Sequence, residues 1–155
     1  MESKSEMKIV RNVSVGFAIT LIVVLASCST EPQPLQYGTD VCHFCKMTLM
    51  DKKFGAELVT KKGKVYKFDD LNCFLNFYHS GFVEPAGFTH QLVVDYSQPG
   101  KLIEATSAFY FKSKELRTPM ASEVAAFSKK HSMDSIKKNM TGFYLVWGEV
   151  ITQFK

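Results

Sequence analysis

The sequence predicts an α+β fold with antiparallel sheet, arranged as two similar ββαβ units. Three observations predict this class. Apolar runs of strand length come in pairs, a helical pattern follows each pair, and another strand-like run closes each half of the chain. We expect the first unit over residues 40–100 and the second over residues 101–155. The halves share little sequence identity, so the predicted repeat is one of element order.

The first pair of strands is predicted at residues 54–60 and 65–68, which are short apolar runs of strand length. Residues 62–64 between them read Lys-Gly-Lys, a sequence that suits a tight hairpin turn. We therefore expect these two segments to pair as an antiparallel hairpin.

A helix is predicted to follow, over about residues 71–79. Asp69 and Asp70 precede it, and a carboxylate in this position caps the first N–H groups of a helix. Helical spacing places four apolar side chains on one face: Leu71, Phe74, Leu75 and Tyr78. Residues 91–96 then form the strand that closes the first unit.

The second half shows the same order. Residues 102–105 and 108–111 are strand-like. A helix is predicted over about residues 118–131, because its first two residues are Thr and Pro, which favour a helix start. Residues 143–151 are predicted to form the final strand.

The N-terminal segment has the three parts of an export signal. Lys4, Lys8 and Arg11 form a basic region, and residues 13–26 form an apolar run too short to span a bilayer as a helix. The run ends in Leu-Ala-Ser followed by Cys28, which resembles the bacterial lipoprotein signal, in which the thiol is acylated before cleavage. The alternatives are an ordinary secretory signal with an incidental cysteine, and a short uncleaved anchor.

This signal predicts where the mature protein resides. Cleavage removes residues 1–27, and acyl chains on Cys28 hold the protein on a bacterial membrane, facing the periplasm or the exterior. Residues 28–39 contain Pro32 and Pro34 and little that could pack, so we expect them to form a tether between the lipid and the folded domain.

The composition does not favour a nucleic-acid-binding protein. The net charge is +4, and the basic residues are scattered along the chain without an aromatic stacking platform. Solvated strand ends and a solvated helix face account for them.

The segment richest in chemistry is a C-x-x-C motif at Cys42 and Cys45, with His43 inside it and Met47 just after it. Thiolate, thioether and imidazole are soft ligands, which favour Cu(I) and Zn(II) over Ca²⁺ or Mg²⁺. Structural zinc commonly takes four ligands from two cysteine pairs, and only Cys73 remains here, so the motif favours copper. An exported protein can also close such a pair as a disulfide.

Several short motifs occur in a distinctive order between residues 37 and 130. They are Cys42-His-Phe-Cys45-Lys-Met47, Phe54-Gly-Ala56, Phe68-Asp-Asp-Leu-Asn-Cys73, Val94-Asp-Tyr96, Ala108-Phe-Tyr110, Thr118-Pro-Met120 and Ala126-Phe127. This ordered set resembles the NosL family, whose members are lipoproteins that act as copper chaperones for nitrous oxide reductase. The resemblance implies a fold of two similar ββαβ units, Cu(I) as the bound metal, and no enzymatic activity.

The resemblance also implies a set of metal ligands. Carried over by position, Cys45, Met47 and Met120 are the first candidates, and Cys42 and His43 are the second. Met120 lies at the start of the second predicted helix, so we expect a site that bridges the two halves of the chain.

Each candidate has a structural alternative. Met47 and Met120 could instead be core residues that fill gaps, and His43 could simply be an exposed side chain. Cys73, among apolar neighbours, is interpreted as a small buried residue rather than as a ligand. The chain also has Lys46 where the family commonly has glycine, which adds a side chain at a turn that glycine would leave open.

Three functions are therefore weighed. The first is a membrane-anchored Cu(I) chaperone that delivers copper to an exported copper enzyme, by resemblance nitrous oxide reductase, with the help of a membrane transport complex. The second is an exported thiol oxidoreductase that uses Cys42 and Cys45 as the exchanging pair. The third is a lipoprotein in which these two cysteines form only a structural disulfide.

Overall fold

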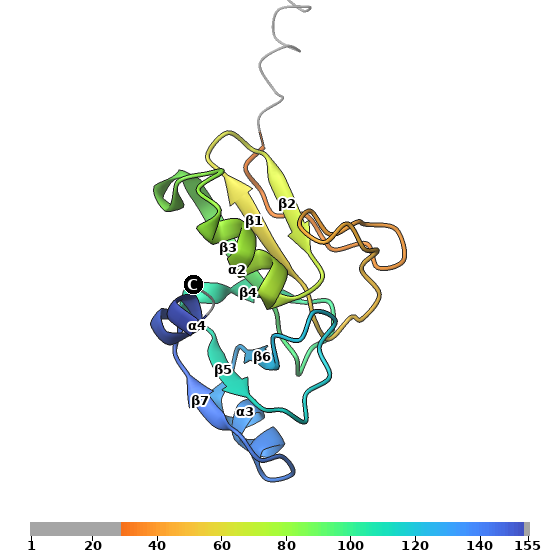
Figure 1. Cartoon of the computed structure of the whole chain (residues 1–155), viewed down its shortest axis with the longest axis vertical. Coiled ribbons are helices and arrows are strands. Elements are labelled where there is room, and N and C mark those ends of the chain that lie inside the picture. The colour runs from red at the N-terminus through yellow and green to blue at the C-terminus, as the bar shows by residue number, and fades with distance from the viewer. Residues whose placement is uncertain (1–28, 154–155) are drawn as a thin grey trace, which may run out of the picture.

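The structure is a computed structural model that describes residues 29–153 (Figure 1). The predicted signal peptide and Cys28 lie outside these described residues. Two antiparallel sheets and three α-helices form the fold, together with single 3₁₀ turns at Pro85–Gly87 and Ala105–Ser107. No helix within the described part of the chain is long and apolar enough to cross a membrane.

The larger sheet has four strands in the order β2-β1-β3-β4. They are β1 (Ala56–Thr60), β2 (Val65–Phe68), β3 (Phe88–Val94) and β4 (Leu102–Glu104), and all neighbours are antiparallel. The predicted hairpin is confirmed, since Ala56 pairs with Phe68 and Val59 with Val65. Gly63 closes its turn with a φ of 77°, a conformation that glycine adopts without a steric penalty.

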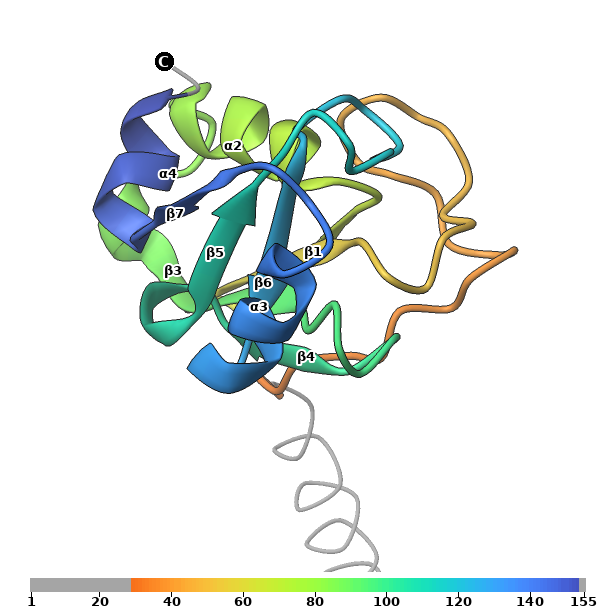
Figure 2. The ribbon, with the colours of Figure 1, turned by 90° about the horizontal axis from the view of Figure 1, so that it is seen from below.

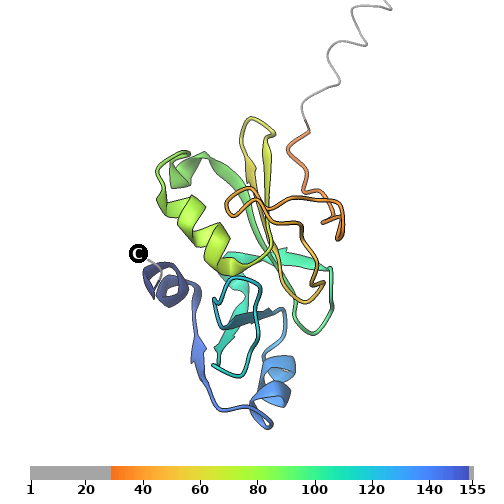
Figure 3. The same ribbon diagram turned by 45° about the vertical axis from the view of Figure 1, so that its right-hand side comes forward.

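Helix α2 (Leu71–His79) covers one face of this sheet, as Figures 1 and 3 show. Its predicted cap is confirmed, because Asp70 accepts a hydrogen bond from the backbone N–H of Asn72. Phe74 and Leu75 are fully buried, and burial of each such side chain contributes about 2 kcal/mol. This apolar face fixes α2, and its first turn, against the end of β2.

The opposite face of β1 is covered by the segment that leads from Ser29 into the domain. Leu35 is buried, Gln33 donates its backbone N–H to the buried Glu57 carboxylate on β1, and the Tyr37 hydroxyl donates to the carbonyl of Phe54. The expectation that little in residues 28–39 could pack is therefore wrong for Leu35 and Tyr37. Both find apolar contacts with parts of the chain that are remote in sequence.

The smaller sheet has three strands in the order β6-β5-β7. Its strands are β5 (Phe109–Lys112), β6 (Val124–Phe127) and β7 (Phe143–Leu145), with α3 (Lys130–Lys137) between β6 and β7. The order β5-β6-α3-β7 repeats β1-β2-α2-β3, so the predicted α+β class with two ββαβ units is confirmed. Helix α4 (Trp147–Gln153) ends the described chain.

Three predictions for the second half are wrong. The strand predicted at residues 102–105 does not open the second unit, because β4 pairs with β3 in the larger sheet. Residues 118–131 do not form one helix, because Val124–Phe127 is a strand that pairs with β5, and α3 begins only at Lys130. A short, fully apolar run has the same pattern in a buried strand and in a buried helix. The final strand ends at Leu145, because Glu149 accepts a hydrogen bond from the backbone N–H of Val146 and caps α4.

The two sheets meet where β3 ends, next to β6 (Figure 2). Asp95 is fully buried there and accepts hydrogen bonds from the hydroxyl groups of Ser97 and Ser128. The backbone N–H of Tyr96 donates to the carbonyl of Ala126 at 2.8 Å. These contacts join the first unit to the second, and the main core cluster includes residues of both sheets.

Candidate metal centre

Residues 41–48 form a tight loop ahead of β1. Val41 and Thr48 form an antiparallel bridge, the backbone N–H of Cys42 donates to the carbonyl of Met47 at 2.8 Å, and the N–H of Lys46 donates to the carbonyl of Cys42 at 3.1 Å. We call this segment the cysteine loop.

Two contacts, one from the cysteine loop and one from the residue just before it, hold this part of the chain against β2. The backbone N–H of His43 donates to the carbonyl of Lys67 at 2.8 Å, and the Lys67 ammonium forms a 2.7 Å ion pair with Asp40. The loop is thereby held beside Asp69, the residue that follows β2.

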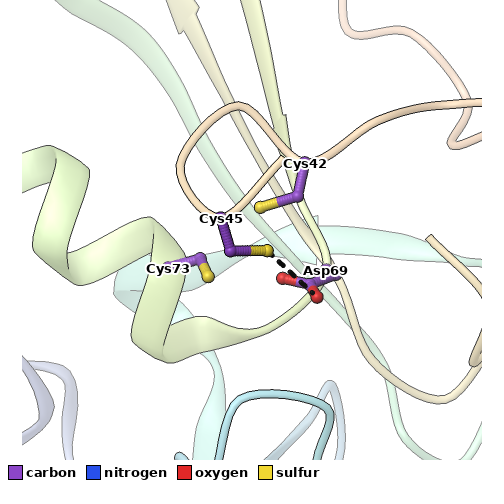
Figure 4. A group of neighbouring side chains, drawn as sticks. All are labelled: Cys42, Cys45, Asp69 and Cys73. Carbon is purple, nitrogen blue, oxygen red and sulfur yellow. Dashed lines mark hydrogen bonds between the residues drawn. The ribbon is translucent and has the colours of Figure 1, made fainter. Parts of the chain in front are cut away.

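Three thiols and one carboxylate converge at this junction (Figure 4). Cys42 and Cys45 come from the cysteine loop, Asp69 from the turn after β2, and Cys73 from the first turn of α2. Their ligand atoms all lie within 4.8 Å of one another. Two thiolates that share one zinc ion, each about 2.3 Å from it, are roughly 4 Å apart, so small side-chain movements would bring this group to coordinating distance.

The four side chains differ in exposure. Cys42, Cys73 and Asp69 are buried, at 0%, 2% and 4% exposure, whereas Cys45 is partly exposed. The group therefore has a closed inner side and one thiol that solvent reaches.

Hydrogen bonds prepare one of the buried thiols for ionisation. Hydrogen bonding from the Cys73 thiol is the largest influence on the pKa of the Cys42 thiol, and backbone N–H groups of Asp69, Cys45 and Phe44 act in the same direction. Although burial opposes ionisation, these donors lower the pKa of Cys42 to about 6. The pKa of Cys73 is raised, because its thiol donates to Cys42 and is buried. Burial likewise raises the pKa of Cys45.

Asp69 has an unsatisfied buried oxygen. Its Oδ2 accepts a hydrogen bond from the Cys45 thiol at 3.5 Å, while its buried Oδ1 has no partner among the described residues. A buried carboxylate oxygen without a partner is costly, and a cation in the group would relieve that cost. The donor set therefore fits a metal ion.

Met120 is held next to this group through the start of α2. Its backbone N–H donates to Oδ2 of Asp70 at 2.7 Å, and its carbonyl accepts from the Asn72 amide at 2.8 Å. Ser122 also donates its N–H to Asp70. The loop that carries Met120 is thus tied to the helix turn that carries Cys73, and the Met120 side chain packs, partly buried, against the core cluster that contains Cys42 and Cys73.

The structure brings together some of the predicted ligands and separates others. Cys42 and Cys45 lie in the group, and His43 does not, because its ring packs edge-on against Tyr66 and Phe77 at centroid distances of 4.7 and 5.3 Å. Met47 is 55% exposed on the outer side of the loop.

Sequence reasoning missed Cys73 and Asp69 as members of the group. Asp69 was interpreted as part of a helix cap, a role that falls to Asp70, and Cys73 as a buried apolar residue. The only sequence signal was proximity, since Asp69 directly precedes the cap of the predicted helix and Cys73 lies in its first turn.

Comparison with known proteins agrees with this fold. The family model NosL matches residues 35–154. The fold is similar to that in the crystal structure of the copper chaperone NosL from Shewanella denitrificans, with a TM-score of 0.65 and 21% sequence identity over 78% of this chain and 96% of that chain. No curated protein matches. Because the family model covers most of the sequence, the chain belongs to the NosL family.

Proposed function

We propose that the protein binds Cu(I) through Cys42, Cys45 and Cys73 and delivers it to an exported copper enzyme. The observation that carries this proposal is the convergence of three thiols, of which one is partly exposed. Thiolates are the ligands that Cu(I) prefers, and the similarity to a copper chaperone supports copper as the cargo. The acceptor, by family resemblance, is nitrous oxide reductase, assisted by a membrane transport complex.

The exposed thiol provides a route for transfer. Cys45 borders the outer side of the cysteine loop, where Val41, Phe44 and Met47 are 53%, 47% and 55% exposed. An acceptor that covers these apolar side chains would bring its own ligands to Cys45 first, and the two buried thiolates would release the ion afterwards. This order lets the ion pass without becoming free in water.

The two methionines have different roles in this proposal. Met120 is tied to the helix turn that carries Cys73, so its thioether is the better candidate for an additional ligand. Met47, exposed beside Cys45, would contact the ion only during uptake or release.

One observation favours a second candidate cargo. Asp69 gives the group a carboxylate beside three thiols, and four such ligands suit tetrahedral Zn(II). Cu(I) is satisfied by two or three sulfur ligands. The Cys45 thiol, which donates to Asp69 in the metal-free protein, would lose its proton on binding Cu(I), so Asp69 would then be a carboxylate outside the ligand set.

The site does not support the thiol oxidoreductase alternative. In thioredoxin-like sites the C-x-x-C pair lies at the N-terminus of a helix, which lowers the pKa of the attacking thiol. Here the pair lies in a loop ahead of β1, and Cys42, the thiol whose pKa is lowered, is fully buried, so a substrate disulfide could not reach it.

Metal competition tests the proposal. The reduced protein is expected to hold Cu(I) against a chromophoric Cu(I) chelator. Replacement of Cys42, Cys45 or Cys73 by Ser removes a direct ligand and should weaken binding by at least about 100-fold, which is the most that loss of an outer group typically costs. Met120→Leu should weaken it less, and Met133→Leu, a buried methionine of the second unit, is the matched control with no effect. Copper retention unchanged in Cys73→Ser would refute the three-thiolate site.

The variant Asp69→Asn distinguishes copper from zinc as the cargo. If Cu(I) is the cargo, this variant should lose only about tenfold in Cu(I) affinity, the lower end for a group outside the ligand set. A zinc site would lose a direct ligand, and Zn(II) binding should then fall far more than Cu(I) binding. Tighter wild-type binding of Zn(II) than of Cu(I) in parallel competition would identify zinc as the cargo.

We propose that lipid on Cys28 anchors the protein to a bacterial membrane. The support is the sequence pattern ahead of this residue, which lies outside the described chain. Cys28→Ala should abolish the acyl adduct, as measured by intact mass and by detergent partitioning. A variant that still partitions with detergent would rule out this attachment point.

A further inference from the structure

The turn between β1 and β2 forms one pole of the molecule. It carries Lys61, Lys62 and Lys64, all exposed, and α3 lies at the opposite end of the long axis (Figures 1 and 3). Within residues 29–153 none of these three lysines takes part in an ion pair, whereas Lys67 and Lys130 do. Three ammonium groups are thus presented together to solvent.

An apolar hollow adjoins these lysines. It has a volume of about 650 Å³, and its walls include the three lysines together with Tyr66, Phe82 and Val83. Phe82 is 67% exposed, and its ring leans edge-on against Tyr66. A surface that combines cations with an exposed aromatic ring is typical of proteins that lie at a membrane interface.

The described chain begins at this same pole. The carbonyl oxygen of Ser29 lies so close to Gly63 that a Cβ on the glycine would approach it to 2.8 Å. Because Cys28 is bonded directly to Ser29, a lipid on Cys28 would bring the membrane surface to this turn.

We infer that the β1–β2 turn, together with Phe82 and Val83, is a membrane-contact face that binds anionic phospholipid headgroups. The inference rests on the lipid attachment proposed above and is independent of copper binding. Two observations carry it. The described chain begins beside this turn, and its three lysines, of which Lys64 lies over the Tyr66 ring at 5.1 Å, have no ion-pair partner in the described chain and so complement anionic lipid.

The charge balance at this pole favours an anionic surface. Lys61, Lys62 and Lys64 outnumber the nearby exposed acidic residues, Glu31 and Glu84. Each lysine near an anionic membrane increases affinity roughly five-fold, and the attraction weakens as salt rises. This contact would orient the anchored protein, with α3 away from the bilayer and the cysteine loop on the flank between the two poles (Figure 1).

Amine footprinting tests the inference on the full lipidated protein. The protein is placed in vesicles of phosphatidylcholine alone, or of phosphatidylcholine with phosphatidylglycerol, and labelled briefly with an amine-reactive reagent. We expect labelling of Lys61, Lys62 and Lys64 to fall at least about threefold in the anionic vesicles and to recover in high salt. Labelling of Lys114, Lys129 and Lys138, in the second unit, should not change. Equal labelling in both vesicles, or equal protection of both groups, would overturn the inference.

Charge reversal provides the matched comparison. The variant K61E/K62E/K64E should lose the protection of the turn's backbone amides from hydrogen exchange in anionic vesicles, and K114E/K129E/K138E, with the same change in net charge, should keep it. All six side chains are exposed, so both variants should fold. Intact mass of each sample reports the acyl adduct on Cys28, so failure of the anchor is distinguished from failure of the contact. Protection retained in K61E/K62E/K64E would refute the role of the lysines.

Discussion

At the scale of single residues, two positions of backbone strain directly follow residues of the candidate metal centre. Lys46, Ala121 and Glu123 have φ values of 65°, 56° and 58°, a conformation that is unfavourable for any residue with a Cβ. Lys46 lies directly after Cys45, and Ala121 directly after Met120. Surrounding contacts must hold a strained backbone in place, and strained residues are found most often at functional sites.

Lys46 offers a direct measurement of this strain. Lys46→Gly should be more stable than Lys46→Ala by about 1 kcal/mol, because only glycine adopts this backbone conformation without a steric penalty. Both variants remove the same ammonium group, so the difference isolates the backbone. Urea denaturation of the metal-free, reduced protein measures it, and equal stability of the two variants would contradict the strain.

At the scale of elements, Asp70 performs two tasks. One oxygen caps α2 through Asn72, and the other holds the backbone N–H groups of Met120 and Ser122. Helix capping and the position of the Met120 loop therefore depend on one buried carboxylate.

Substitutions of Asp70 separate these tasks. Asp70→Ser retains a capping oxygen but is too short to reach the Met120 loop, whereas Asp70→Ala loses both contacts. We expect Asp70→Ala to be less stable than Asp70→Ser by about 1 kcal/mol, the contribution of an N-cap. Both should show weaker Cu(I) binding if the Met120 thioether is a ligand. Wild-type Cu(I) affinity in Asp70→Ser would show that the Met120 loop does not contribute to the site.

The elements that sequence patterns identified are those with local signals. The first hairpin has Gly63 at its turn, and α2 has its cap and one apolar face within a dozen residues. In contrast, Val124–Phe127 becomes a strand through its pairing with β5, a contact that no local pattern contains.

The members of the candidate metal centre could be predicted only in part, because local sequence patterns do not contain tertiary contacts. Cys42 and Cys45 are neighbours in sequence, whereas Cys73 joins them through the packing of α2 against β2. His43 was a plausible ligand by its position, but the turn of the loop directs its ring onto Tyr66. Proximity in sequence therefore indicated where the site is, and tertiary packing decided its members.

At the scale of the whole molecule, the junction between the sheets depends on an ionised side chain. Burial of Asp95 raises its pKa, but hydrogen bonds from Ser128 and Ser97 outweigh this effect and hold the pKa below the ordinary value of 3.8. A carboxyl group with a lowered folded-state pKa stabilises the protein above that ordinary value, and this contribution is lost as pH falls through the folded-state pKa.

The buried Asp95 carboxylate therefore predicts how the free energy of unfolding changes at low pH. Asp95→Asn should lower the free energy of unfolding at pH 7 by about 1–3 kcal/mol, since buried hydrogen bonds lose their charged acceptor. The gap between wild type and variant should narrow as pH falls below about 4, where the wild-type carboxylate takes up its proton. Denaturant titrations across pH 2–7 measure this gap. Asp51→Asn, an exposed carboxylate, is the control, and a gap independent of pH would contradict the role given to Asp95.

The three thiols of the candidate metal centre affect how long the metal-free protein stays able to bind metal. Three thiols lie within 4.8 Å of one another, so an oxidant that reaches them can convert two into a disulfide. The third thiol is then left alone and cannot form the three-sulfur site. Under the proposed function, a bound ion would occupy all three sulfur atoms and block that reaction. In an oxidising compartment, reloading would then compete with inactivation, and the fraction of competent molecules would depend on how quickly copper arrives.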